Sequence, residues 1–131
     1  MSKLKRFFIV ISFILFVIVA AGIFGFFQIN KSIKSYESFS FGGLDLSQVE
    51  DGTYTGSEDG GMVNAAVEVT VENHTITKIN ILSHECGTGK PAEVIVNDIV
   101  ANNSLEVDTI GGATYSSNVL RVAVYHALTN N

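Results

Sequence analysis

VEVTVENHTITKINILSH (Val67–His84) is the stretch of this sequence that decides the fold. In its first half, valines alternate with polar residues, which is typical of a strand with one buried and one solvated face. The alternating residues are Val67, Val69 and Val71 with Glu68, Thr70 and Glu72. Asn73-His74 then fits a two-residue hairpin turn, and the second half places Ile79 and Ile81 on one face of a second strand. The stretch therefore predicts an antiparallel pair of strands with one polar side.

Shorter patterns on either side of this pair complete a domain. DGTYTG (Asp51–Gly56) predicts another short strand that enters from a turn. After the loop HECGTGK, Pro91 suits the first position of a helix whose apolar stripe ends at Asn102-Asn103. SSNVLRVAVYHAL predicts a final helix with Ser116 or Ser117 as its N-cap. This order of elements predicts a small α+β domain, an antiparallel sheet with two helices packed on one face.

Residues 7–27, FFIVISFILFVIVAAGIFGFF, form a separate segment that contains no charge. A helix of this length, at about 1.5 Å per residue, spans the hydrocarbon core of a bilayer. The run is longer than the apolar core of a signal peptide, which has about 7–15 residues, so we expect an uncleaved anchor. Basic residues are denser before the segment than after it. This predicts a cytoplasmic N-terminus, with the body of the protein on the extracytoplasmic side.

The chain is therefore expected to have four parts. These are a cytoplasmic N-terminus at 1–6, a transmembrane anchor at 7–27, a juxtamembrane linker at 28–45 and one domain at 46–131. From Leu46 onward the chain carries three basic and eleven acidic residues, a net charge of −8, which argues against nucleic acid as a partner. Cys86 is the only cysteine, so no intramolecular disulfide is possible. His84, Glu85 and Cys86 lack the second cluster of ligands that a zinc site needs.

DTIGGATYSS (Asp108–Ser117) is the stretch whose residues are best suited to a chemical function. Gly111-Gly112 permits a positive φ and leaves no side chain in the way of an approaching molecule. Thr114 follows this open backbone just before a helix is expected to start, and helix N-termini favour anions. The residues alone are compatible with a threonine that carries or contacts a phosphate, and also with the commoner arrangement of an ordinary glycine turn before a serine N-cap.

From about Glu50 to Leu128 the chain resembles the FMN-binding domain of membrane electron-transfer complexes of the Rnf and sodium-pumping NADH:quinone reductase type. The resemblance is carried by DGTYTG, VEVTVENHTITKINILSH and SLEVDTIGGATYSS. The family motif is Asp, two variable residues, Ser or Thr, Gly, Ala and Thr. Asp108, Gly112, Ala113 and Thr114 match it, whereas Gly111 stands where the family has Ser or Thr. The loop after His84 also differs, because it reads ECGTGKP here.

The resemblance implies a membrane-anchored flavoprotein that relays electrons and is a carrier domain rather than an independent enzyme. It implies that a flavin transferase esterifies the Thr114 hydroxyl to the phosphate of FMN, with FAD as the donor, and that a membrane redox donor supplies electrons. The residues implied at the cofactor site are Asp108, Gly111, Gly112, Ala113, Thr114, Tyr115, Ser116, Ser117 and His84. Ser116 and Ser117 are expected to cap the helix and contact the phosphate, and Tyr115 to pack in the core or on the flavin ring. A flavin-free or non-covalently FMN-binding accessory module at the membrane surface is the alternative.

Overall fold

The computed structural model describes residues 2–85, 87 and 89–130, and the chain divides into two compact units, residues 1–35 and 36–131. Helix α1 (Lys3–Glu37) forms the first unit and ends two residues into the second. This helix is long and apolar enough to cross a membrane, and it contains the whole segment predicted as the anchor. It continues into the stretch predicted as a linker, because residues 28–37 include neither proline nor glycine to stop it.

The second unit is built on a three-stranded antiparallel sheet in the order β1-β2-β3. Its strands are β1 (Gly52–Asp59), β2 (Asn64–Glu72) and β3 (Thr75–Glu85). The predicted hairpin is confirmed: Glu72 pairs with Thr75, and Asn73 and His74 have φ values of 52° and 60°. Two positive φ values in a two-residue loop are the type I′ geometry, whose twist matches that of the flanking strands.

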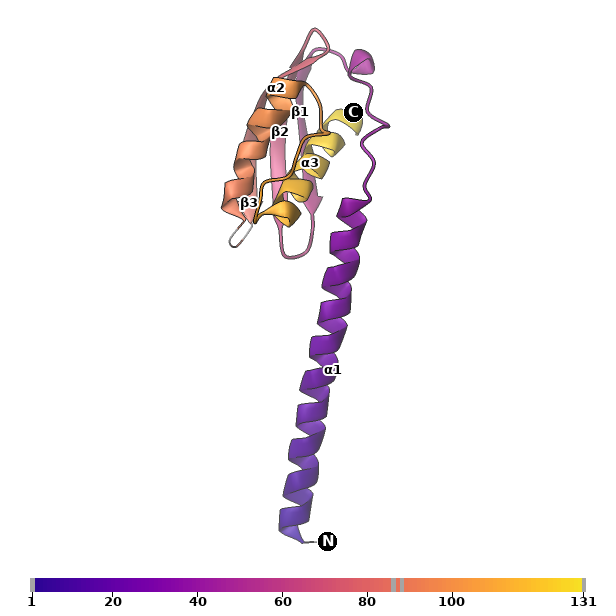
Figure 1. Ribbon diagram of the computed structural model, residues 1–131, viewed down its shortest axis with the longest axis vertical. Coiled ribbons are helices and arrows are strands. Elements are labelled where there is room, and N and C mark those ends of the chain that lie inside the picture. Colours follow the sequence, from indigo (N-terminus) through magenta and orange to yellow (C-terminus); the bar gives the residue numbers. More distant parts are fainter. Residues whose placement is uncertain (1, 86, 88, 131) are drawn as a thin grey trace. The chain divides into compact units, whose positions relative to one another are not determined.

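Two α-helices follow the sheet, as predicted, and Figure 1 shows that both lie over the same face of it. The first is wound as a 3₁₀ turn, η2 (Lys90–Val94), with proline in its first turn, and continues as α2 (Ile95–Asn102). Asn103 ends it in the left-handed conformation, with φ 48°. The second, α3 (Thr114–Thr129), starts earlier than predicted: Ala113 is its N-cap, so the assignment of Ser116 or Ser117 to that position is wrong.

The core lies between the sheet and the two helices. Alternate residues of β2 are buried, and they pack with apolar side chains of α2 and α3. At Gly56 the backbone of β1 approaches that of α3 so closely that a Cβ atom would lie 2.3 Å from Ala123 O and from Ala127 N. Only glycine fits at such a contact, which gives the physical reason for the last residue of DGTYTG.

The chain between α1 and β1 packs against this core. Phe41 and Val49 are buried, and the Arg121 guanidinium lies 4.4 Å from the centroid of the Phe41 ring. A short 3₁₀ turn, η1 (Leu46–Gln48), is capped by Asp45, whose carboxylate accepts bonds from the backbone and side chain of Ser47. These bonds hold the pKa of Asp45 below its usual range. The compact unit therefore includes residues that the sequence pattern assigns to a linker.

Candidate functional site

The loop that precedes α3 presents Thr114 to solvent. A turn closed by the bond from Ala113 N to Ile110 O (2.9 Å) leads directly into the helix, and Gly112 within it has a φ of +76°. Thr114 is exposed as the first residue of α3. A Cβ atom added at either Gly111 or Gly112 would meet no other atom within 4 Å. The threonine therefore stands beside open backbone, as the sequence predicts.

Ser117 fixes this loop to the helix from inside. Its side chain is fully buried, its Oγ accepts a bond from Ile110 N (3.0 Å), and it donates a bond to Ala113 O (2.8 Å). The first backbone bond of the helix runs from Ser117 N to the same Ala113 oxygen (2.9 Å). Ser116 is buried as well, with 3% of its surface exposed. Both serines thus lie on the core side of the first turn, while Thr114 lies on its outer side.

Tyr115 packs against two neighbours that are distant from it in sequence, Gly60 and Tyr36. Its hydroxyl donates a hydrogen bond to Gly60 O in the turn between β1 and β2. Its ring stands edge-on to the ring of Tyr36, with centroids 5.4 Å apart and an interplanar angle of 82°. These contacts support the expectation that Tyr115 packs in the fold, and they connect the first turn of α3 to the turn after β1 and to the end of α1.

His84 lies near the end of β3 and points toward the helix layer, since its register partner on β2 is the buried Ala65. Its side chain is 1% exposed, and Nδ1 lies 3.2 Å from Glu93 Oε1 in η2. Facing a carboxylate, Nδ1 carries a hydrogen, while the buried Nε2 has no hydrogen-bond partner among the described residues. A buried polar atom without a partner is unfavourable by about 1–3 kcal/mol, so this nitrogen suits a polar group of a ligand.

The predicted site residues thus form two groups. Asp108 to Ser117 form one continuous loop and first helical turn, whereas His84 bonds to Glu93. Figure 1 shows the end of β3 and the start of α3 at the same end of the domain, and η2, which carries Glu93, packs against α3. Sequence reasoning missed Glu93, whose only local sign is a carboxylate just after Pro91 in the loop that follows the histidine.

Asp108 is exposed and lines an open groove with two other acidic residues, Asp98 and Glu106. Within residues 2–85, 87 and 89–130, no three His, Cys, Asp or Glu side chains are placed to hold a metal ion. Cys86, weighed in the sequence as part of a metal site, lies outside the described residues.

The family model of the FMN-binding domain matches residues 60–129, more than half of the chain. The chain belongs to the FMN-binding domain family. The match runs from the turn before β2 to the end of α3, so the FMN-binding domain includes His84, Glu93 and Thr114. FMN is accordingly its cofactor, and the resemblance noted in the sequence is confirmed at the level of the family. Comparison with curated proteins gave no significant match. With its long apolar N-terminal helix, the chain fits a membrane-anchored FMN-binding module.

Proposed function

We propose that FMN is attached covalently, through its phosphate, to the hydroxyl of Thr114, and that the loaded protein relays electrons at the membrane surface. The observation that carries the proposal is the exposure of Thr114 as the first residue of α3, beside the open backbone of Gly111 and Gly112. An attacking hydroxyl must be reachable by a modifying enzyme, and this one is the outward-facing hydroxyl of a motif whose two serines are buried.

The electrostatics of the first helical turn support a phosphate at this position. The amides ahead of the first backbone bond of α3 point out of the helix N-terminus, where the positive end of the helix dipole stabilises an anion. In the proposed transfer the Thr114 Oγ–P bond forms and the pyrophosphate bond of FAD breaks. AMP leaves, and the hydroxyl proton passes to solvent or to a base of the flavin transferase. No residue of this chain is needed as the catalyst, because the transferase supplies that chemistry.

His84 and Glu93 are the residues we assign to the polar part of the flavin ring. The Glu93 carboxylate fixes the ring of His84 through Nδ1, so that the buried Nε2 is left to bond with a polar group of a ligand. Bound FMN supplies the redox chemistry, and the chain holds and orients it. Asp108, on the exposed loop, is assigned to recognition of the motif by the flavin transferase.

The N-terminal helix and the charge distribution support the rest of the proposed function. The apolar residues 7–27 anchor the protein, the denser basic flank stays in the cytoplasm, and the acidic domain lies on the extracytoplasmic side. A covalent bond keeps the cofactor from being lost on that side of the membrane. The electron donor in this arrangement is a redox protein of the same membrane, and the domain acts as a carrier.

Co-expression with a flavin transferase, followed by a denaturing gel viewed for flavin fluorescence, tests the attachment. We expect a fluorescent band for the wild type and for Thr114→Ser, which keeps a hydroxyl, and no band for Thr114→Ala. Thr109→Ala, in the same loop, is the matched control and is expected to keep the band. A band that persists in Thr114→Ala would assign the bond to another residue. Yellow protein that loses its colour on denaturation would instead show non-covalent FMN, which the missing hydroxyl at Gly111 favours as the second candidate.

A further inference from the structure

The last turn of α1 contributes a side chain that lies near the turn that carries Thr114. This turn (residues 110–114) is called the attachment turn below. Tyr36 places its ring edge-on against Tyr115, the residue that follows Thr114, with centroids 5.4 Å apart. Its hydroxyl donates a hydrogen bond to Glu58 Oε1 on β1 (2.6 Å). Tyr36 belongs to the same compact unit as both partners, although it lies outside residues 60–129, which define the family match.

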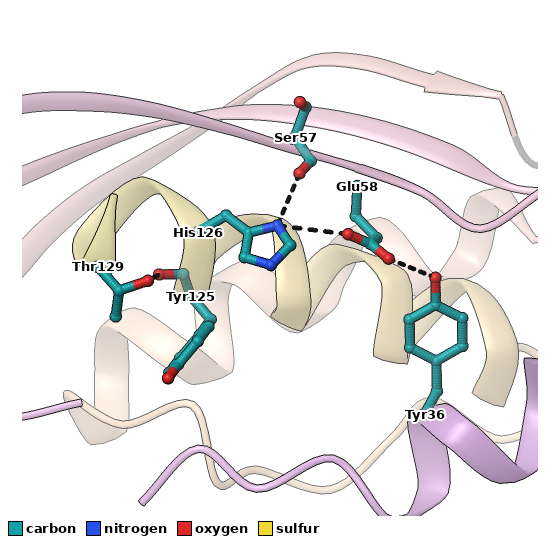
Figure 2. A network of polar contacts seen from close by, with 6 residues as sticks. All are labelled: Tyr36, Ser57, Glu58, Tyr125, His126 and Thr129. Atoms are coloured by element: carbon teal, nitrogen blue, oxygen red, sulfur yellow. Dashed lines mark hydrogen bonds and ion pairs between the residues drawn. The ribbon is translucent and has the colours of Figure 1, made fainter. Parts of the chain in front are cut away.

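Glu58 is itself held from a third element, so the position of Tyr36 is well defined. His126 of α3 approaches the other carboxylate oxygen, with 3.3 Å between Nδ1 and Oε2, and the same nitrogen lies 2.9 Å from Ser57 O. Figure 2 shows Glu58 between the Tyr36 hydroxyl and the His126 ring. Burial, and then the bond to Glu58, raise the pKa of Tyr36, so its phenol stays protonated and acts as the donor.

Tyr115 is consequently held at two points. Its hydroxyl is bonded to Gly60 O, and its ring is supported by Tyr36. Aromatic pairs in this edge-to-face geometry contribute about 0.5–1.5 kcal/mol beyond the area that they bury. Because Tyr115 and Thr114 are consecutive residues of the first helical turn, whatever holds the Tyr115 ring also restricts the backbone that carries the Thr114 hydroxyl.

We propose that Tyr36 is a positioning residue for flavin attachment at Thr114, so that the working FMN-binding domain begins at the end of the anchor helix rather than at the start of the family match. This inference rests on the proposed covalent linkage. The edge contact of the Tyr36 ring with Tyr115 sets the order of the turn, and the bond from the Tyr36 hydroxyl to Glu58 only adds to the hold on that ring.

The test uses the full-length chain in membranes, with a flavin transferase and FAD, and measures the initial rate of in-gel flavin fluorescence. Tyr36→Ala is expected to lower the rate roughly two- to twelvefold, the range that corresponds to the ~0.5–1.5 kcal/mol of one aromatic pair. Tyr36→Phe keeps the ring and is expected to stay within about twofold of wild type on the same reasoning. Tyr54→Ala is the matched control, because Tyr54 is likewise a partly buried tyrosine packed against the core, but its hydroxyl bonds to Glu50 O and not to the turn that carries Thr114. Its rate should equal that of the wild type.

A second measurement separates positioning from general stability. In fully modified samples that are folded by circular dichroism, we expect lower flavin fluorescence anisotropy for Tyr36→Ala, restored by Tyr36→Phe. Should the alanine variant fail to fold, Tyr36→Leu, which keeps an apolar side chain without an aromatic edge, replaces it with the same expectation. Equal rates and anisotropies for wild type and Tyr36→Ala, or an equal loss in Tyr54→Ala, would overturn the role of Tyr36. A wild-type chain that takes up no covalent flavin would overturn the linkage itself.

Discussion

Replacing Ser117 by alanine tests whether this residue holds the loop before α3, at Ile110 and Ala113, onto the helix. The substitution removes the acceptor of the Ile110 N–H and one donor to Ala113 O. Ala113 O keeps its bond from the backbone N of Ser117, so only the Ile110 amide loses its partner. An amide left unpaired in a partly buried place is unfavourable by about 1–3 kcal/mol.

Helix propensity partly offsets this loss, because alanine is more favourable than serine inside a helix by about 0.5 kcal/mol. We therefore expect Ser117→Ala to lower the free energy of unfolding by about 1–2 kcal/mol. For a unit of the size of residues 36–131, this corresponds to a decrease in Tm of roughly 5–15 °C. Ser104→Ala is the control: it removes an exposed oxygen that accepts from Glu106 N, and water replaces that bond, so the change should stay within about 0.5 kcal/mol.

Thermal unfolding of the full chain in detergent, followed by circular dichroism, measures the two Tm values. Hydrogen exchange at the Ile110 amide reports the local event, and its exchange should accelerate in Ser117→Ala and stay unchanged in Ser104→Ala. An unchanged Tm together with unchanged Ile110 exchange would refute the reasoning, because it would mean that the buried hydroxyl does not hold the loop.

Three other predictions follow from the packing of the domain. Gly56→Ala should unfold the domain or lower its stability by about 3 kcal/mol or more in the same thermal experiment, since its Cβ would lie 2.3 Å from backbone atoms of α3. Gly111→Ser should leave Tm unchanged, because its Cβ would meet open space, and should keep or increase the rate of flavin incorporation. Gly112→Ser should instead lower the free energy of unfolding by about 1–2 kcal/mol, because Gly112 has a φ of +76°. The wild type should lose stability as pH rises above about 10, because the raised pKa of Tyr36 means that the unfolded state ionises this phenol before the folded state does. Tyr36→Phe should lack this pH-dependent loss of stability when unfolding is measured at neutral and alkaline pH.

The parts of the fold that depend on neighbouring residues could be predicted from the sequence. Alternation along β2 and a two-residue turn at Asn73-His74 specify the hairpin, because both follow from local backbone geometry. The N-cap of α3 could not be assigned in the same way. Ser117 has a typical capping side chain, but its hydroxyl turns back to Ile110 and Ala113, so the helix starts a turn earlier than residue type alone indicates.

The candidate site was predictable where it is continuous in sequence and not where it is assembled from distant elements. The motif around Thr114 could be found because its residues are consecutive. His84 and Glu93 are separated in sequence by the loop after β3, and Tyr36 and Tyr115 by most of the domain. Neither contact therefore leaves a periodic pattern in the sequence. The segment at 28–45 was predicted as a linker because it follows the apolar run and is rich in Ser, Lys and aromatic residues. The burial of Phe41 within it depends on contacts with α3 that only the folded chain provides.

If FMN is linked to Thr114 as proposed, the turn that presents Thr114 also sets the order of folding and modification. Thr114 is exposed, but the backbone that presents it is held from inside by Ser117, a residue that is buried only once α3 lies on the sheet. Under the proposed linkage, the transferase therefore recognises the domain after folding and not the nascent segment. Each covalently bound flavin then marks a molecule that had folded before its modification, so the chains of a preparation that never folded all belong to its unmodified fraction.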